Sequence, residues 1–393
     1  MAWDIKKSWE LTQKSLVQMG ENWGTNFVGQ IDNYEMMAIV NRYRREEAMF
    51  YEGKSDENSF ATTAQEFWYL HYLNRARLRR LGISVRYNSI KDTPLDGNRY
   101  PSLSYYKEGM SRICQLEDYE RVEKDYIRNG RVIYRETRNR EVEAFYLLTS
   151  QTPGGNYVCP NCGAEGKLES FLDGCDSCNT KFQVGDFETK IMSMYRSPGF
   201  MFDRKGSVHA RLSNSIAYVL SQDPAHYQFP PDIMLKEDDP EFSEEHFYAA
   251  LVNKVLSIHY AEHMDEIKAF VEQDLTGLLR QCGNIMDVKM ILYHFMKYGK
   301  DEENQYLAVY VKLRLMICEN EGVRFAEPAL ILHMVRSLQA IKERRSRIML
   351  YRCRNCGAGL TLLNGGQCEF CGTSLDLKKY DWVIRRVEMA PNA

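Results

Sequence analysis

Hydrophobic positions recur with helical spacing along the first part of the chain. Apolar side chains return every three or four positions, which is the period of one face of an α-helix. Gly82 follows the last of these stretches, at a position where a glycine commonly ends a helix. The pattern predicts helices over residues 3–19, 34–51 and 62–81.

Beyond the third helix the apolar period changes to two, which indicates β-strands. Strands predicted over residues 115–127 and 131–137 flank Asn129-Gly130, a dipeptide that supplies positive φ in a tight hairpin turn. Further strands over residues 141–148 and 187–195 lie on either side of a cysteine-rich segment. We expect these two strands to pair, with the cysteines at the tip of a long hairpin.

The second half of the chain repeats this order of elements. A short helix is predicted near residues 208–220, and residues 222–240 form a proline-bearing linker. Residues 327–341 fit either a strand or a helix. The remaining elements are a helix that starts after Ser243, a helix over residues 267–278, strands over 286–298 and 305–318, and strands over 347–351 and 380–387 that flank a second cysteine-rich segment.

Eight of the eleven cysteines fall into two groups, each made of two C-x2-C pairs. Four thiolates satisfy the tetrahedral preference of Zn²⁺ and leave no position for water, so each group predicts a closed structural site and the chain is expected to bind two Zn²⁺. Two disulfides or an iron–sulfur cluster are the alternatives in each group. The predicted ligands are Cys159, Cys162, Cys175 and Cys178 in the first group, and Cys353, Cys356, Cys368 and Cys371 in the second.

Composition narrows the protein class. The 393 residues are 44% hydrophobic, with a net charge of −3, so binding of nucleic acid by bulk charge is not expected. No signal peptide and no membrane-spanning run is recognisable, which together with the paired cysteines indicates a reducing cytoplasm. Cys114, Cys282 and Cys318 are expected to be buried thiols.

The second half resembles a known family. Phe242 to Phe247, Glu266 to Thr276 and the strand motif Asp381-Trp382-Val383-Ile384 resemble the carboxy-terminal domain of the mitochondrial inner-membrane translocase tether and its bacterial relatives. The resemblance covers residues 240–387 and, more weakly, residues 32–195. It implies an α+β, cystatin-like cone fold of the nuclear-transport-factor-2-like type, with helices on a curved antiparallel sheet and an apolar cavity.

An internal duplication follows if both halves share this fold. The expected domains are residues 1–199, with a zinc ribbon at 157–182, and residues 242–393, with a zinc ribbon at 351–375; residues 200–241 connect them. In place of the short turn between the last two strands of the family, each domain carries a four-cysteine ribbon. The family uses its cones for protein or lipid contact, so the resemblance implies a protein partner, with peripheral membrane contact as a further possibility.

One catalytic pattern occurs. His259, Glu262 and His263 match the H-x-x-E-H order in which two histidines on a helix bind zinc and a glutamate activates water. The motif is short, no third ligand is identifiable, and the apolar stripe of the helix already explains its presence. A zinc hydrolase is therefore retained only as an alternative to a protein without enzymatic activity.

Basic residues give two more candidate sites. The arginines near the end of the third helix, Arg75 to Arg80, either bind an anionic partner or complement the helix dipole. The first ribbon, residues 159–186, has two lysines against five acidic residues, whereas residues 352–379 have four cations against two acidic residues and Phe370 between the last cysteines. We therefore expect a non-enzymatic protein-binding or scaffold protein, with a nucleic-acid-associated factor that uses the second ribbon as the alternative.

Overall fold

The fold is that of a computed structural model of the whole chain. We call residues 33–197 the N-terminal half and residues 231–390 the C-terminal half. The predicted helices over 3–19 and 208–220 and the strand over 347–351 lie outside the described residues. The structure describes residues 33–55, 60–90, 102–108, 111–119, 122–138, 142–149, 156–159, 164–179, 188–197, 231–240, 242, 244–320, 322–342, 367–368, 371–374, 376–379 and 381–390.

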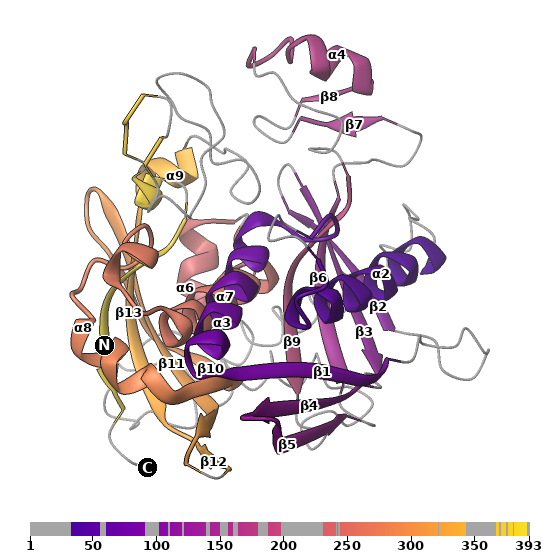
Figure 1. Cartoon of the computed structure of the whole chain (residues 1–393). Coiled ribbons are helices and arrows are strands. Elements are labelled where there is room, and N and C mark those ends of the chain that lie inside the picture. Colours follow the sequence, from indigo (N-terminus) through magenta and orange to yellow (C-terminus); the bar gives the residue numbers. More distant parts are fainter. Residues whose placement is uncertain are drawn as a thin grey trace.

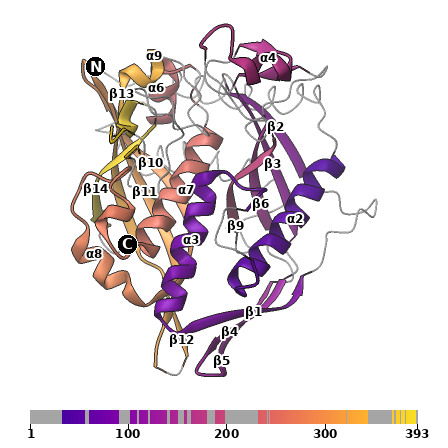
Figure 2. The ribbon, with the colours of Figure 1, turned by 45° about the horizontal axis from the view of Figure 1, so that its top comes forward.

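The chain forms a mixed α and β structure with antiparallel sheets, as the α+β class requires. Two helices, α3 (Gln65–Arg80) and α7 (Glu244–Tyr260), lie side by side in the centre, between a sheet of the N-terminal half and a sheet of the C-terminal half (Figures 1 and 2). Both helices contact β9 (Lys190–Ser197) and β10 (Ile285–Lys300). The core therefore lies between the two sheets.

The helices predicted over residues 34–51 and 62–81 are confirmed with small shifts at their ends. Helix α2 covers Asn33–Tyr51, and α3 ends where Gly82 takes a φ of +68°. The amides of Leu81 and Gly82 donate to the carbonyls of Arg77 and Arg79, both at 3.0 Å. These contacts are the usual termination by a left-handed glycine.

The helix predicted over residues 267–278 is wrong. The 3-10 helix η3 (Met264–Glu266) precedes this segment, which contains turns, an isolated bridge at Val271 and the start of the short helix α8 (Thr276–Gln281). Val271 forms a parallel bridge with Ile384, in which the amide of Glu272 donates to the Ile384 carbonyl at 2.9 Å. Ile267, Phe270 and Leu275 are buried as well, although no single helix carries them, so their spacing in the sequence resembles the apolar stripe of a helix.

The linker predicted over residues 222–240 is wrong in its last part. Helix α6 covers Pro231–Asp238 and packs against β10. Pro231 stands at its first position, where a missing N–H costs no hydrogen bond. Directly after this helix, Asp239 accepts a hydrogen bond from the buried Arg336 at 2.7 Å, so this stretch belongs to the folded core.

Two larger antiparallel sheets lie in the described part of the N-terminal half. The strand predicted over 115–127 is in fact interrupted, because β3 (Ser111–Tyr119) belongs to one sheet and β4 (Val122–Arg128) to the other. The predicted hairpin turn is confirmed, with φ of 52° at Asn129 and 74° at Gly130. The sheet orders are β1-β4-β5 and β2-β3-β6-β9, with β1 Ile83–Ile90, β2 Ser102–Glu108, β3 Ser111–Tyr119, β4 Val122–Arg128, β5 Arg131–Arg138 and β6 Val142–Thr149.

One sheet dominates the C-terminal half. The ambiguous residues 327–341 contain both a strand and the short helix α9 (Leu338–Lys342). The last strand pairs with residues 330–335, so the strand expected over 380–387 exists with shifted ends. The order is β10-β11-β13-β14, with β12 beside β11; the bounds are β11 Asn304–Cys318, β12 Val323–Ala326, β13 Ala329–Ser337 and β14 Val383–Met389.

The strand pairings of the two halves correspond. In the N-terminal half, β1 pairs with β4 and β2 pairs with β3, both antiparallel. In the C-terminal half, the long strands β10 and β11 form one antiparallel pair that corresponds to these two. Strand β5 lies beside β4 as β12 lies beside β11, and β6 pairs with β9 as β13 pairs with β14. Each last strand also forms a parallel bridge to the segment before a helix, Thr63 with Ile191 and Val271 with Ile384.

The two halves share one hydrophobic cluster, which runs from Met36 on α2 to Ile384 on β14. Side chains of one half also bond the main chain of the other: Asn253 donates to the Met192 carbonyl at 2.8 Å, and Asn74 to the Met286 carbonyl at 2.9 Å. The halves are therefore held in a fixed arrangement. Among the described helices, none has the length and apolar character needed to span a membrane.

Candidate metal centre

Three of the predicted zinc ligands come together in a small module between β6 and β9. Strands β7 (Tyr157–Val158) and β8 (Glu165–Gly166) form a hairpin, and helix α4 (Leu168–Asp173) follows it. The module lies beyond one end of the sheet β2-β3-β6-β9 (Figure 1). Because β6 and β9 pair with each other, the expectation that a long hairpin carries these cysteines is confirmed.

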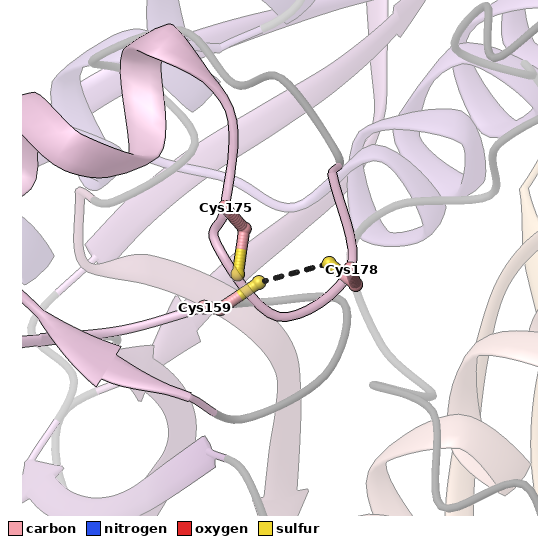
Figure 3. Close-up of side chains that lie close together, drawn as sticks. All are labelled: Cys159, Cys175 and Cys178. Atoms are coloured by element: carbon pink, nitrogen blue, oxygen red, sulfur yellow. Dashed lines mark hydrogen bonds between the residues drawn. The ribbon is translucent and has the colours of Figure 1, made fainter.

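The sulfur atoms of Cys159, Cys175 and Cys178 point toward one another (Figure 3). All three lie within 4.8 Å of one another, and those of Cys159 and Cys178 are 3.7 Å apart. Tetrahedral zinc with bonds of about 2.3 Å requires sulfur atoms about 3.8 Å apart, whereas a disulfide brings them to about 2.05 Å. The distance between Cys159 and Cys178 is therefore too long for a disulfide between these two residues, and the spacing of the three sulfur atoms suits a metal ion.

Local packing sets this spacing. Cys159 follows β7, and its amide donates to the Ala164 carbonyl at 2.8 Å. Phe171 is 3% exposed and packs with Cys159 and Cys175 in a cluster separate from the main core. A Cβ added to Gly166 would lie 3.2 Å from the Phe171 ring, so a residue without a side chain lets the ring lie against the hairpin.

The last pair of cysteines in each group adopts the same turn. In the first group, the amide of Asn179 donates to the Cys175 carbonyl at 2.6 Å, with a φ of 56° at Asn179. In the second, the amide of Gly372 donates to the Cys368 carbonyl at 2.9 Å, with a φ of 71° at Gly372. The left-handed residue after the last cysteine is thus a glycine in the second group, Gly372, and an asparagine in the first, Asn179.

The second group is described only in part. Cys368 is buried and Cys371 is exposed within one tight turn, and the Cys371 Sγ lies 3.3 Å from the Thr373 hydroxyl. Residues Gln367 and Ser374 close the turn as an antiparallel bridge. Cys162, Cys353 and Cys356 lie outside the described residues, so these predicted ligands stay predictions. The described cysteines of both groups could hold metal.

The histidine motif is not arranged as a helical zinc site. Helix α7 ends at Tyr260, so His263 lies beyond it and is exposed, whereas His259 is 2% exposed inside the helix. The His259 Nδ1 atom lies 2.7 Å from the Val255 carbonyl oxygen, and burial lowers the pKa of His259. In the part of the chain that the structure describes, the metal-ligand group found is the one formed by Cys159, Cys175 and Cys178.

The arginines of α3 serve the contact between the halves. Arg77 is 1% exposed and donates to main-chain carbonyls at the ends of two elements of the other half, those of Tyr260 at 3.1 Å, Ala261 at 2.8 Å and Cys282. Arg80 forms an ion pair with Glu262. These cations satisfy carbonyls left open at helix ends, so part of the arginine run, for which an anionic partner was one of two alternatives, is structural.

A small cavity of about 60 Å³ lies between the halves. Beside it, the imidazole of His71 hydrogen-bonds the hydroxyls of Tyr43 and Tyr51, each at 3.0 Å. This volume is far below the range of about 300–1,000 Å³ that ligand sites commonly have. Sequence analysis did not identify this group, because α2, α3, β4 and β10 contribute to it and no local spacing links them.

Two thiols outside the groups behave as expected. Cys282 and Cys318 are 4% and 5% exposed, and burial raises the pKa of Cys282 to about 11, which keeps it protonated. The side chain of Cys114 lies outside the described residues. The cysteine chemistry that the structure describes is therefore concentrated at the two groups.

Comparison with known proteins gives no relative. The chain has no significant match to a protein-family model, a curated protein or a solved structure.

Proposed function

We propose that this chain is a zinc-stabilised binding or scaffold protein without enzymatic activity, which binds a protein partner in the cytoplasm. The observation that carries the proposal is the sulfur group of Cys159, Cys175 and Cys178, which lies between two paired strands and has the sulfur spacing that zinc requires. A closed site supplies folding free energy and leaves no position for a reacting water. Each half would bind one Zn²⁺, with Cys162 completing the first site.

We further propose that the halves are duplicated cone domains related to the translocase-tether family. The corresponding pairings of β6 with β9 and of β13 with β14 support this, as do the parallel bridges Thr63–Ile191 and Val271–Ile384. In both halves the cysteine segment follows the penultimate strand of the sheet. Two rigid zinc-bound tips on one shared core suit a protein that presents surfaces to a partner.

Metal analysis of the purified full chain tests this proposal. We expect two zinc ions per wild-type chain and one each in Cys175→Ser and Cys371→Ser. Cys282→Ser is the matched control and keeps both, because this buried thiol belongs to neither group. Iron in place of zinc, or one zinc per wild-type chain, would contradict the assignment.

His263→Ala separates the proposal from the hydrolase alternative. His263 is exposed and lies outside the sulfur groups, so this variant should retain two zinc ions. A zinc ion lost from His263→Ala, accompanied by loss of a hydrolytic activity, would favour the enzyme instead.

A further inference from the structure

An open groove of about 860 Å³ crosses the sheet of the C-terminal half. It is lined by side chains from β10, β11, β13 and β14, and its volume is in the range of ligand sites. The residues that matter for its chemistry are Lys297, Lys300, Tyr306, His333, Arg385 and Arg386.

One row of side chains runs across all four strands of the groove. Lys297 pairs with Ala308, Ala308 with His333, and His333 with Arg386. Lys297 and Arg386, at the two ends of the row, are exposed, whereas Leu307 and Val309 beside Ala308 on β11 are buried. Neighbouring strands are about 4.8 Å apart, so the row is about 14 Å long. The row has a cation at each end, and the small side chain of Ala308 leaves space between them on the surface of the sheet.

Two β-bulges turn cations into the groove. On β10 the pairing skips Met296, between Phe295 and Lys297, and on β14 it skips Arg385, between Ile384 and Arg386. A bulge reorients the side chains next to it. In a regular strand consecutive side chains face opposite sides, yet Arg385 and Arg386 are both exposed and both line the groove.

Two of the groove cations have no acidic partner among the described residues. Lys300 pairs with Asp238 and Arg386 with Glu388, each at 2.5 Å. The acidic Glu272 at the groove edge is engaged by Lys378, which follows the second cysteine group, at 2.7 Å. Lys297 and Arg385 are left uncompensated there, so the groove favours an anion.

An aromatic side chain stands beside these cations. The Tyr306 hydroxyl donates to Asp301 Oδ2 at 2.6 Å, and Asp301 also accepts from the amides of Glu303 and Asn304 at 2.8 and 2.7 Å. The ring is thereby fixed to the β10–β11 turn. On the neighbouring row, His294 and Tyr310 stack with centroids 4.6 Å apart. An acidic peptide needs only the cations, whereas a nucleic acid uses both cations and aromatic rings.

We propose that this groove binds single-stranded nucleic acid, with phosphates on Lys297 and Arg385 and a base stacked on Tyr306. Two neutralised phosphates correspond to a slope of about −1.4 in log K against log salt, at about −0.7 per phosphate of a single strand. The site differs from the ribbon considered in the sequence, and it requires no metal. It adds a partner to the scaffold role proposed above.

Fluorescence anisotropy of the full chain with a short labelled oligo(U) at low salt tests the proposal. Lys297→Gln/Arg385→Gln should weaken binding at least tenfold and bring the salt slope close to zero. Tyr306→Leu should weaken binding about 5-fold or more, at about 1–3 kcal/mol per stacked base, with the slope unchanged. Tyr306→Phe keeps the ring and should bind nearly as wild type.

Arg131→Gln/Arg280→Gln is the matched control, because it removes the same charge from exposed positions outside the groove and should bind as wild type. The proposal is overturned if no variant differs from wild type, if oligo(U) does not bind at low salt, or if a labelled poly-glutamate peptide binds more tightly and ignores Tyr306→Leu. Zinc measured on the same samples keeps the two proposals separate: a zinc-free chain that binds oligo(U) contradicts only the metal sites.

Discussion

The Lys254 ammonium on α7 lies 2.5 Å from Asp381 Oδ2 and 2.7 Å from the Trp382 carbonyl oxygen, with both charged side chains largely buried. Burial alone would raise the pKa of Asp381, but the attraction of Lys254 and hydrogen bonds hold it below the usual range. The pair therefore exists as ions. It fixes the point at which the chain returns from the second cysteine group to β14.

Breaking this pair from one side should destabilise the protein strongly. Lys254→Met leaves a buried carboxylate without its cation, and we expect the free energy of unfolding to fall by about 3–5 kcal/mol. Lys254→Met/Asp381→Asn should recover part of that loss, because no uncompensated charge remains. Urea unfolding of the single and double variants measures the coupling. Strictly additive losses would show that the two side chains do not stabilise each other.

The same pair predicts a pH dependence. Because the folded-state pKa of Asp381 is depressed, its contribution to stability is present above the unfolded pKa of about 3.9 and is lost as pH falls below about 4. Asp381→Asn should therefore lose less stability than the wild type between pH 5 and pH 3. Unfolding free energies across this range test the expectation; parallel curves for the two proteins would exclude a depressed pKa.

Arg77 should couple the unfolding of the two halves. Arg77→Met leaves the carbonyls of Tyr260, Ala261 and Cys282 without this buried donor, and each unsatisfied polar group costs about 1–3 kcal/mol. We expect a loss of at least about 3 kcal/mol. Arg79→Met, on the exposed face of the same helix turn, should change stability by less than about 0.5 kcal/mol. Equal losses in both variants would mean that Arg77 acts only through helix propensity.

Local signals in the sequence predicted the elements whose burial follows a simple period. Strand β11 alternates buried and half-buried residues along nearly its whole length, and α3 ends at Gly82 as expected. The helix prediction for residues 267–278 was wrong because Val271 is buried by pairing with Ile384, more than a hundred positions away. The linker prediction was wrong for residues 231–238 because a proline can stand at the start of a helix as well as in a linker.

The candidate sites also divide into one that a local sequence pattern predicts and others that only long-range contacts create. The spacing of Cys159, Cys175 and Cys178 is a local chemical pattern, and the structure brings these three together. The role of Arg77 depends on carbonyls of the other half, and the groove depends on bulges opposite His333 and Val309. Contacts of this kind arise only once distant strands are paired, so no spacing in the chain indicates them.

Removal of the metal from the first group should have a local effect. Cys159, Phe171 and Cys175 form a cluster separate from the main core, and a module of this size has little apolar area to hold it folded without metal. After chelation, we expect hydrogen exchange to speed up in residues 164–179 while β6 remains protected, because β6 pairs with both β3 and β9. Cys175→Ser should reproduce this pattern without chelator, and Cys282→Ser should not. Simultaneous loss of protection in β6 and in the module would show instead that the metal holds the whole N-terminal half together.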